Sequence, residues 1–312
     1  MEAVFLKLLN MSIAAGWLVL AVAALRFLLK KAPKAIRCVL WALVGIRLIC
    51  PFSFVSALSL IPSAETVSPD ILYSQAPTIH TGISALNRTV NPIISESLSP
   101  SVGASVNPLQ VITSAATVVW IIGVAILLAY AAISYLRLRR RVSTAMRLRG
   151  QLWLCDNISS PFILGFFKPR IYLPSHMDEM QLAHVIAHEN AHIRRHDHWW
   201  KPIGFFLLAV YWFNPLMWLA YILLCRDIEL ACDEKVIKDL SVTEKKAYSE
   251  ALLSFSVPQR MITACPLAFG ELGVKERIRN VLSYKKPAFW IIIAAAAACV
   301  ILAVCFLTNP KD

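Results

Sequence analysis

The chain has 312 residues, of which 58% are hydrophobic and 16% are charged, and its mean hydropathy is +0.61. An ordinary soluble domain has about 45–50% apolar and about 25% charged residues, so this chain is too apolar for one and is predicted to be a polytopic membrane protein with one modest soluble domain. The same composition excludes a disordered chain, a collagen and a small disulfide-bonded domain. The net charge of +12 does not indicate nucleic-acid binding, because most of the basic excess lies in 137–286 while 62–110 is slightly acidic.

Four apolar stretches are long enough to cross a bilayer, which takes about 20 residues. We expect these membrane helices at 8–25, 38–61, 111–136 and 287–307. Clusters of Lys and Arg follow the first and third stretches and precede the fourth, and the positive-inside rule assigns such clusters to the cytoplasm. Both termini and the loop 62–110 are therefore predicted to be external.

This pattern divides the chain into three parts. Residues 1–136 hold three membrane helices, residues 137–286 form a cytoplasmic domain, and residues 287–312 hold the fourth membrane helix and a short external tail. The loop 62–110 is rich in Ser, Thr, Pro and Asn without a helical or strand period, so we expect a mostly irregular external connection. Arg47, in the second stretch, is interpreted as a structural residue that snorkels or is paired internally.

The segment 137–286 is predicted to be a mixed α+β domain. Short strands are expected at 151–155 and 170–173, separated by turn-forming Ser, Pro and Gly residues. A helix is expected from about residue 175 to about residue 196.

An uncharged stretch at 202–225 is predicted to form a hairpin of two short helices that dips into the inner leaflet. Asn214 and Pro215 lie at its centre, where proline breaks a helix and disfavours helical geometry in the residue before it. Basic residues flank both ends, which suits two cytoplasmic ends. The alternative is an ordinary fifth membrane span.

Five of the seven histidines lie within 184–198, and among them stands the sequence His188-Glu189-Asn190-Ala191-His192, an H-E-x-x-H motif on the predicted helix. Residues four apart share a helical face, so His188 and His192 can direct two ring nitrogens at one zinc ion. Glu189 can then act as the general base that takes a proton from the attacking water. The plainer alternative is a polar helix face with coincidental histidines.

A catalytic zinc needs a third protein ligand, for which Glu229 is the main candidate. Asp233, one turn further on, can accept the N–H of a ligand histidine from outside the metal site. A solvated acidic helix face is the alternative for both residues. His196 and His198 are nearer in sequence, as is His184 on the other side, but one straight helix does not easily wrap a third side chain round the same ion. Asp197 is interpreted as an ion-pair residue.

Four motifs carry a resemblance to a known family. They are Ser160-Pro161-Phe162-x-x-Gly165, Lys168-Pro169-x-Ile171-x-Leu173-Pro174, His188-Glu189-x-x-His192-x-x-Arg195-x-Asp197 and Glu229-x-x-Cys232-Asp233. In this order, and with the pattern of membrane stretches, they make residues 1–308 resemble the BlaR/MecR-type membrane zinc metallopeptidases, the signal-transducing antirepressors of β-lactam resistance.

The resemblance implies a polytopic α-helical membrane protein with an inserted cytoplasmic α+β zinc-protease domain of gluzincin-like type. It implies Zn²⁺ bound by His188, His192 and Glu229, with Glu189 as the base and Asp233 outside the ligand shell. A strand from 151–173 would hold the substrate by backbone pairing. The antirepressors carry a penicillin-binding sensor domain after their last span. Here only 308–312 follow and the outer segments hold no Ser-x-x-Lys motif, so we expect no direct covalent sensing of a β-lactam.

We therefore predict a membrane-embedded, signal-transducing endopeptidase of an antibiotic response that cleaves a cytoplasmic protein such as a transcriptional repressor. The expected partners are a protein or peptide substrate and membrane lipids, without direct contact to nucleic acid, and a homodimer or a separate sensor protein is a further candidate. The alternatives are a housekeeping or quality-control protease and a non-catalytic receptor with a structural zinc. Glu189 argues against the last, because a structural zinc needs no adjacent base.

Overall fold

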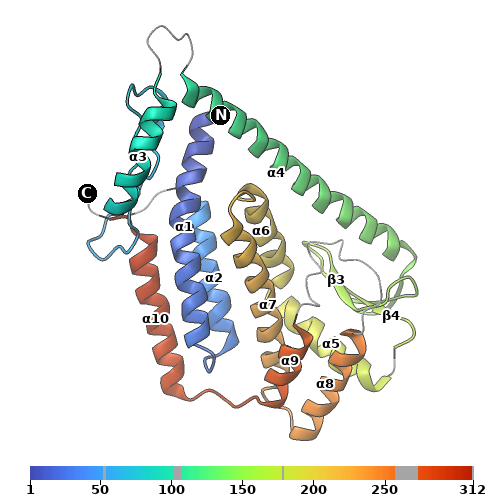
Figure 1. The fold of residues 1–312 in the computed structure, drawn as a ribbon. Coiled ribbons are helices and arrows are strands. Elements are labelled where there is room, and N and C mark those ends of the chain that lie inside the picture. The colour runs from blue at the N-terminus through green and yellow to red at the C-terminus, as the bar shows by residue number, and fades with distance from the viewer. Residues whose placement is uncertain (52–53, 101–106, 178, 257–272, 311–312) are drawn as a thin grey trace.

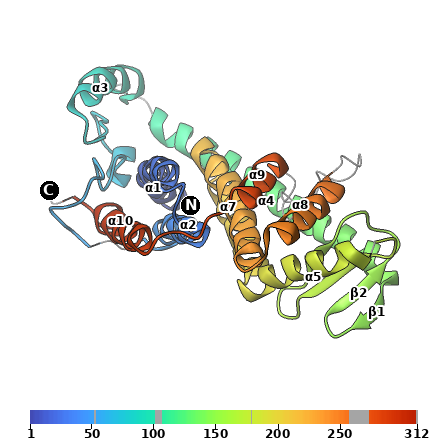
Figure 2. The same ribbon diagram turned by 90° about the horizontal axis from the view of Figure 1, so that it is seen from below.

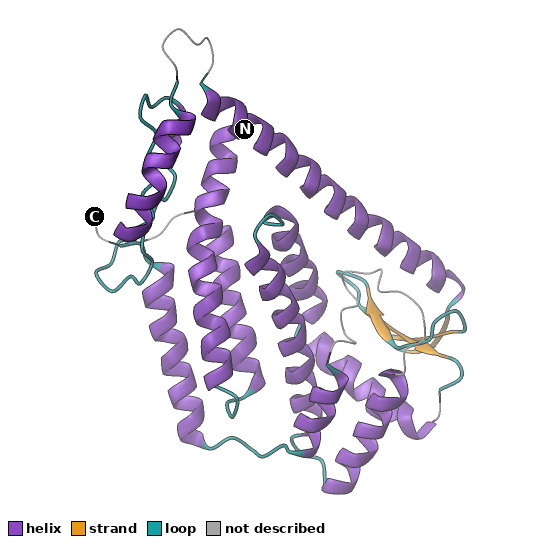
Figure 3. Cartoon of the chain, viewed as in Figure 1, coloured by secondary structure: helices purple, strands orange, loops and turns teal. Residues whose placement is uncertain are grey.

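The structure is a computed structural model that describes residues 1–51, 54–100, 107–177, 179–256 and 273–310. The described part is mostly helical and has one small sheet (Figures 1 and 3). Its helices are α1 (Glu2–Leu28), α2 (Lys34–Ile49), α3 (Ser84–Leu98), α4 (Pro108–Arg141), α5 (Glu179–Arg194), α6 (Asp197–Val210), α7 (Pro215–Ile237), α8 (Val242–Ser256), α9 (Val274–Leu282) and α10 (Phe289–Leu307). Its strands are β1 (Met146–Arg149), β2 (Leu152–Cys155), β3 (Phe162–Leu164) and β4 (Arg170–Pro174).

Within the described residues, three helical segments are long and apolar enough to cross a membrane: Glu2–Leu28, Pro108–Thr144 and Phe289–Leu307. The prediction of one helix over 38–61 is wrong at its C-terminal end. The second helix, α2, has 16 residues and ends at Ile49, because Cys50 precedes Pro51 and proline disfavours helical geometry in the residue before it. Within α2, Nη2 of Arg47 donates to Oδ1 of Asn309 at 2.7 Å, so this arginine is paired internally as expected.

The segment 62–110, predicted to be mostly irregular, contains the 15-residue helix α3, which its composition does not predict. Asn87 and Asn91, four residues apart on one face of α3, bind the loop that precedes it. Oδ1 of Asn91 accepts the N–H of Ile79 at 2.9 Å, and Oδ1 of Asn87 accepts the N–H of Thr81 at 3.0 Å. The polar composition that suggested a loop thus supplies the side chains that fix the helix to it.

Helices α6 and α7 form an antiparallel pair that packs on α1 and α2 (Figures 1 and 2). The shared apolar core includes Leu18, Leu40, Leu208 and Tyr221. Asn214 lies between α6 and α7 and connects α7 to α1. Its Oδ1 accepts the N–H of Leu216 and caps α7, while its Nδ2 donates to Oγ of Ser12 in α1 at 2.7 Å. The helices have 14 and 23 residues and extend beyond the predicted hairpin 202–225, since α6 begins at Asp197 and α7 continues to Ile237.

A buried carboxylate links α7 to the first two helices. Asp227 has no exposed surface and lies 2.7 Å from Nε of Arg26 and 3.5 Å from Nη1 of Arg37. Its Oδ2 also accepts the indole N–H of Trp41 at 2.9 Å. Removing one partner of a buried ion pair leaves an uncompensated charge, so this cluster fixes the position of α7 against α1 and α2.

The four-stranded sheet has the order β1-β2-β4-β3, in which β2 and β4 are parallel and the other pairs are antiparallel. The strands expected at 151–155 and 170–173 are confirmed as β2 and β4. One face of the sheet packs on α5, with Ile171 and Leu173 against Val185. The other face packs on the last turns of α4, so the sheet lies between a long apolar helix and the H-E-x-x-H helix.

Candidate metal centre

Helix α5 brings the two histidines of the motif together as their spacing predicts. The Nε2 atoms of His188 and His192 lie 3.1 Å apart, and both residues are buried. The helix ends at Arg194, and His196 follows with a left-handed backbone (φ 59°) and an exposed side chain. The chain thus turns away from His188 and His192 before it reaches His196. His196 therefore does not contact these two histidines.

Helix α7 supplies the carboxylate that faces both histidines. Oε2 of Glu229 lies 3.4 Å from Nε2 of His188, and its Oε1 lies 3.5 Å from Nε2 of His192. One ligand atom from each of the three residues lies within 4.8 Å of the others, and all three residues are buried. Among the described residues, neither His184 nor His198 belongs to such a group. Two imidazoles and a carboxylate form a donor set typical of catalytic zinc, so the residues present fit this metal.

The outer nitrogen of each imidazole faces a carboxylate. Oδ2 of Asp197 lies 2.9 Å from Nδ1 of His192, and Oδ1 of Asp233 lies 3.3 Å from Nδ1 of His188. Such partners favour a proton on Nδ1 and leave the lone pair of Nε2 free for a metal. Asp197 also pairs with Arg195 at 3.3 Å, so it makes the expected ion pair and in addition contacts a motif histidine.

Three further side chains complete the centre, and no motif or spacing in the sequence predicts them. Nζ of Lys201 lies 2.8 Å from Oε1 of Glu229, and Nη1 of Arg277 lies 3.3 Å from Oε2. Arg277 also donates from Nε to Asp233 at 2.8 Å. The hydroxyl of Tyr248 donates to Oδ1 of Asp233 at 2.7 Å. These side chains come from α6, α8 and α9, so only the packing of distant segments brings them to the site.

The charges at this centre hold the carboxylates ionised. Burial alone would raise the pKa of Glu229, but Lys201, His192 and Arg277 hold it well below its usual range. Burial likewise opposes ionisation of Asp233, and the guanidinium of Arg277 outweighs it and lowers the pKa. Burial lowers the pKa of His188, yet hydrogen bonds to Asp233 and Glu229 raise it to about 9.

A second group of possible ligands shares one histidine with the first. Asp197 and Cys232 both approach Nδ1 of His192, the thiol at 3.2 Å. Burial, together with nearby Asp197 and Glu229, raises the pKa of the Cys232 thiol well above its usual value, and metals bind the thiolate. The protonated thiol donates to Oδ2 of Asp197 at 3.1 Å. Cys232 therefore supports the His192–Asp197 contact, and the first group is the better metal site.

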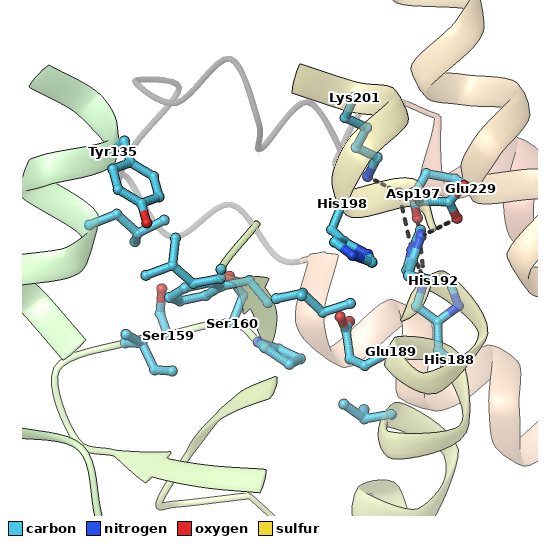
Figure 4. A pocket seen from close by; sticks show the side chains of 18 of the residues that line it. Tyr135, Ser159, Ser160, His188, Glu189, His192, Asp197, His198, Lys201 and Glu229 are labelled. Carbon is cyan, nitrogen blue, oxygen red and sulfur yellow. Dashed lines mark hydrogen bonds and ion pairs between the residues drawn. The ribbon is translucent and has the colours of Figure 1, made fainter. Parts of the chain in front are cut away.

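The centre opens on one large cavity of about 910 Å³. Glu189 lies beside His188 and directs its carboxylate into the cavity, where Figure 4 shows it apart from Glu229. The opposite wall consists of α4, strand β3 and the loop before it, with Tyr135, Ser159 and Ser160 among its residues. The metal ligands, a free carboxylate and an edge strand thus surround the same space.

A membrane protein with a buried His–His–Glu group on an H-E-x-x-H helix, beside a cavity, has the build of a metallopeptidase. The model of the BlaR1 peptidase M56 family matches residues 6–281, and the chain belongs to this family of metalloproteases. The resemblance of the sequence to BlaR/MecR-type proteins is thereby confirmed.

Two kinds of regulatory protein are among its relatives. The methicillin resistance mecR1 proteins of Staphylococcus aureus and Staphylococcus epidermidis are 27% identical over 137 residues, which are 41% of this chain and 23% of each relative. The regulatory protein BlaR1 of Bacillus licheniformis is 29% identical over 233 residues, which are 64% of this chain and 37% of the relative. The chain thus matches well under half of the length of these relatives.

Proposed function

We propose that the chain is a membrane-embedded zinc endopeptidase that transduces a signal by cleaving a cytoplasmic protein such as a transcriptional repressor. The observation that carries this proposal is the convergence of His188, His192 and Glu229 next to the free carboxylate of Glu189 in one cavity. The regulatory names of the relatives support the choice of a regulatory substrate over a housekeeping one.

In this proposal His188, His192 and Glu229 hold zinc, which supplies a Lewis acid for the scissile carbonyl and activates the attacking water. Glu189 accepts the proton of that water and passes it to the leaving amine. Asp197 and Asp233 keep the two imidazoles in the orientation and tautomer that ligation needs. Lys201 and Arg277 contact Glu229 from both oxygens, so they position this carboxylate.

Strand β3 is the segment we propose to bind the substrate. It forms one edge of the sheet, and its residues Phe162, Ile163 and Leu164 line the cavity that holds Glu189. An unpaired strand edge can bind an extended peptide through backbone hydrogen bonds. A peptide added to β3 would run through the cavity past the metal centre.

A cleavage assay with the purified full chain tests the proposed function. Loaded with zinc, the protein is expected to cut a protein substrate identified by profiling new N-termini in expressing cells, and a chelator is expected to abolish the cleavage. Zinc added back after removal of the chelator should restore it, since the ligands are the protein's own side chains. Cleavage that persists when no zinc is detectable would contradict the proposal. Bound zinc without any cleavage would indicate a structural metal and a non-catalytic protein.

We propose a topology in which both termini and α3 are external and the peptidase domain is cytoplasmic. Asn309, after α10, pairs with the chain around Val55, so the ends of α2 and α10 lie at one end of the molecule, as Figure 1 shows. The pair α6–α7 then dips into the inner leaflet and returns, which is supported by its packing on α1 and α2. The metal ligands before and after this hairpin require both of its ends on one side.

Labelling with a membrane-impermeant maleimide tests this topology. In a background without native cysteines, Arg194→Cys and Lys235→Cys are expected to react from the same, cytoplasmic side of sealed vesicles, because they flank the hairpin at exposed positions. Glu96→Cys in α3 serves as the control and should react only from the opposite side. If Arg194→Cys and Lys235→Cys react from different sides, α6–α7 crosses the membrane and does not return to the cytoplasmic side, which contradicts the hairpin.

A further inference from the structure

A cationic pocket of about 500 Å³ lies at the sheet, and its lining shares no residue with the cavity of the metal centre. Its charged lining consists of Arg147 from β1, Arg170 from β4 and Lys168 from the loop between β3 and β4. All three side chains are exposed, and within the described part of the chain none of them has a carboxylate within salt-bridge distance. Three cations without a carboxylate partner around one pocket create a positive potential that favours an anion.

Aromatic side chains complete this pocket. The guanidinium of Arg170 lies over the ring of Trp153 at 4.5 Å, and Phe167 at the rim is 82% exposed. Beyond the rim, Phe166 stacks on Trp199 at 4.4 Å between ring centroids, and the neighbouring Trp200 is half exposed. Cationic residues mixed with exposed Trp and Phe are typical of surfaces at the boundary between water and lipid.

The pocket lies on the face of the sheet that is turned toward α4. Arg147 pairs with Trp153 across β1 and β2, so both lie on the face where Tyr172 packs against the last turns of α4 (Figure 1). In the proposed topology these last turns emerge from the membrane on the cytoplasmic side. The uncovered part of the same face then looks at the inner leaflet.

Positive charge is in large excess in the sequence around this pocket. The segment 137–155, which joins α4 to β2, contains six arginines and no acidic residue. This segment continues the basic end of a helix that is long and apolar enough to cross a membrane. An anionic headgroup surface next to that helix complements these charges, and its lipid interface also accommodates the exposed aromatic rings. An acidic protein partner would complement the charges alone.

We propose that this pocket binds the phosphate of an anionic phospholipid and docks the sheet of the peptidase domain on the inner leaflet. The three cations contact the headgroup, and Phe167 enters the interface beside it. Because β3 and β4 belong to the same sheet, docking would also hold the edge strand beside the metal centre at a fixed height above the membrane. The inference rests on the proposed topology, but lipid binding needs neither zinc nor cleavage and is measured without them.

Binding of phosphatidylglycerol to the full chain in neutral detergent tests the proposal by native mass spectrometry. We expect phosphatidylglycerol to bind more tightly than phosphatidylcholine. The triple variant Arg147→Gln, Lys168→Gln, Arg170→Gln is expected to lose about 100-fold in affinity at low salt, at about fivefold per cation near an anionic surface. Physiological salt should reduce this difference. The matched control Lys235→Gln, Lys238→Gln, Lys246→Gln removes the same charge at exposed positions on α7, just after α7 and on α8, and should bind as the unmodified chain does.

Three results would overturn the proposal. The first is equal binding of phosphatidylglycerol and phosphatidylcholine, and the second is an equal loss in the triple variant and its matched control. The third is displacement of the lipid by an equal concentration of inorganic phosphate, which would define a small-anion site instead of a lipid site. If the triple variant does not fold, as judged by its circular dichroism and thermal unfolding, the single variants Lys168→Gln and Arg147→Gln decide, each with an expected loss of about fivefold.

Discussion

The variant Glu189→Gln is expected to bind zinc as the unmodified chain does and to lose peptidase activity by about 10²–10⁴-fold. Glutamine keeps the shape of the side chain but cannot accept a proton, and general base catalysis contributes about this factor. Zinc content stays constant because Glu189 directs its carboxylate into the cavity and not at the group formed by His188, His192 and Glu229. The measurements are metal content by mass spectrometry and the cleavage rate of an identified substrate.

The matched control for this variant is Glu250→Gln, an exposed glutamate on α8 outside the residues that line the cavity. It makes the same chemical change and should leave both zinc content and cleavage unchanged. A Glu189→Gln variant that cleaves as fast as the unmodified chain would exclude Glu189 as the base. A variant that loses zinc as well would instead make Glu189 a ligand, and the donor set would have to be revised.

The part of the site that the sequence predicts follows from local geometry. His188 and His192 are four residues apart on a helix, and their Nε2 atoms meet without help from any other segment. Glu229 was placed by the need for a third ligand and by the family resemblance, and α7 brings it within 3.5 Å of both rings. The hairpin α6–α7 explains how residues some 40 positions apart reach one site.

The part that the sequence does not predict depends on tertiary packing. Lys201, Tyr248 and Arg277 have no motif or period, and each reaches the centre because its helix packs on α5 or α7. A buried Lys or Arg is normally paired with a carboxylate, but the sequence alone does not show that these residues are buried. The pairing of these side chains with Glu229 and Asp233 depends on the packing of the helices and is not predicted by either motif.

The errors in the fold have local causes. The helix α3 was missed because Ser, Thr, Asn and Pro dominate its sequence, although Asn87 and Asn91 recur at the helical spacing of four. The length of α2 was overestimated because hydropathy continues through Pro51, where the backbone has already left the helix. In both cases composition averaged over a window outweighed the position of single residues.

The variant Glu229→Gln is expected to lower zinc affinity by more than about 100-fold, whereas His196→Ala should leave it unchanged. Loss of a direct ligand exceeds the loss from an outer partner, which is typically about 10–100-fold, so Asp233→Asn is expected to fall between the two. His196 lies beyond the end of α5 with an exposed side chain, and it belongs to neither group of converging ligands among the described residues. Equilibrium dialysis against buffered zinc measures all three affinities.

Glutamine is the better substitution at position 229 because of the cations around it. Glu229→Ala would leave the half-buried ammonium of Lys201 with neither the charge nor the hydrogen bond of its carboxylate, whereas Arg277 keeps Asp233. Removing one partner of a buried ion pair costs about 3–5 kcal/mol. Glutamine keeps an oxygen that accepts from Lys201 while it removes the negative charge that zinc requires. Thermal unfolding of the zinc-free proteins separates the two effects, since Glu229→Gln should unfold at a higher temperature than Glu229→Ala. If His196→Ala loses the metal and Glu229→Gln keeps it, the third ligand is not Glu229 and the hairpin no longer has to return to the cytoplasmic side.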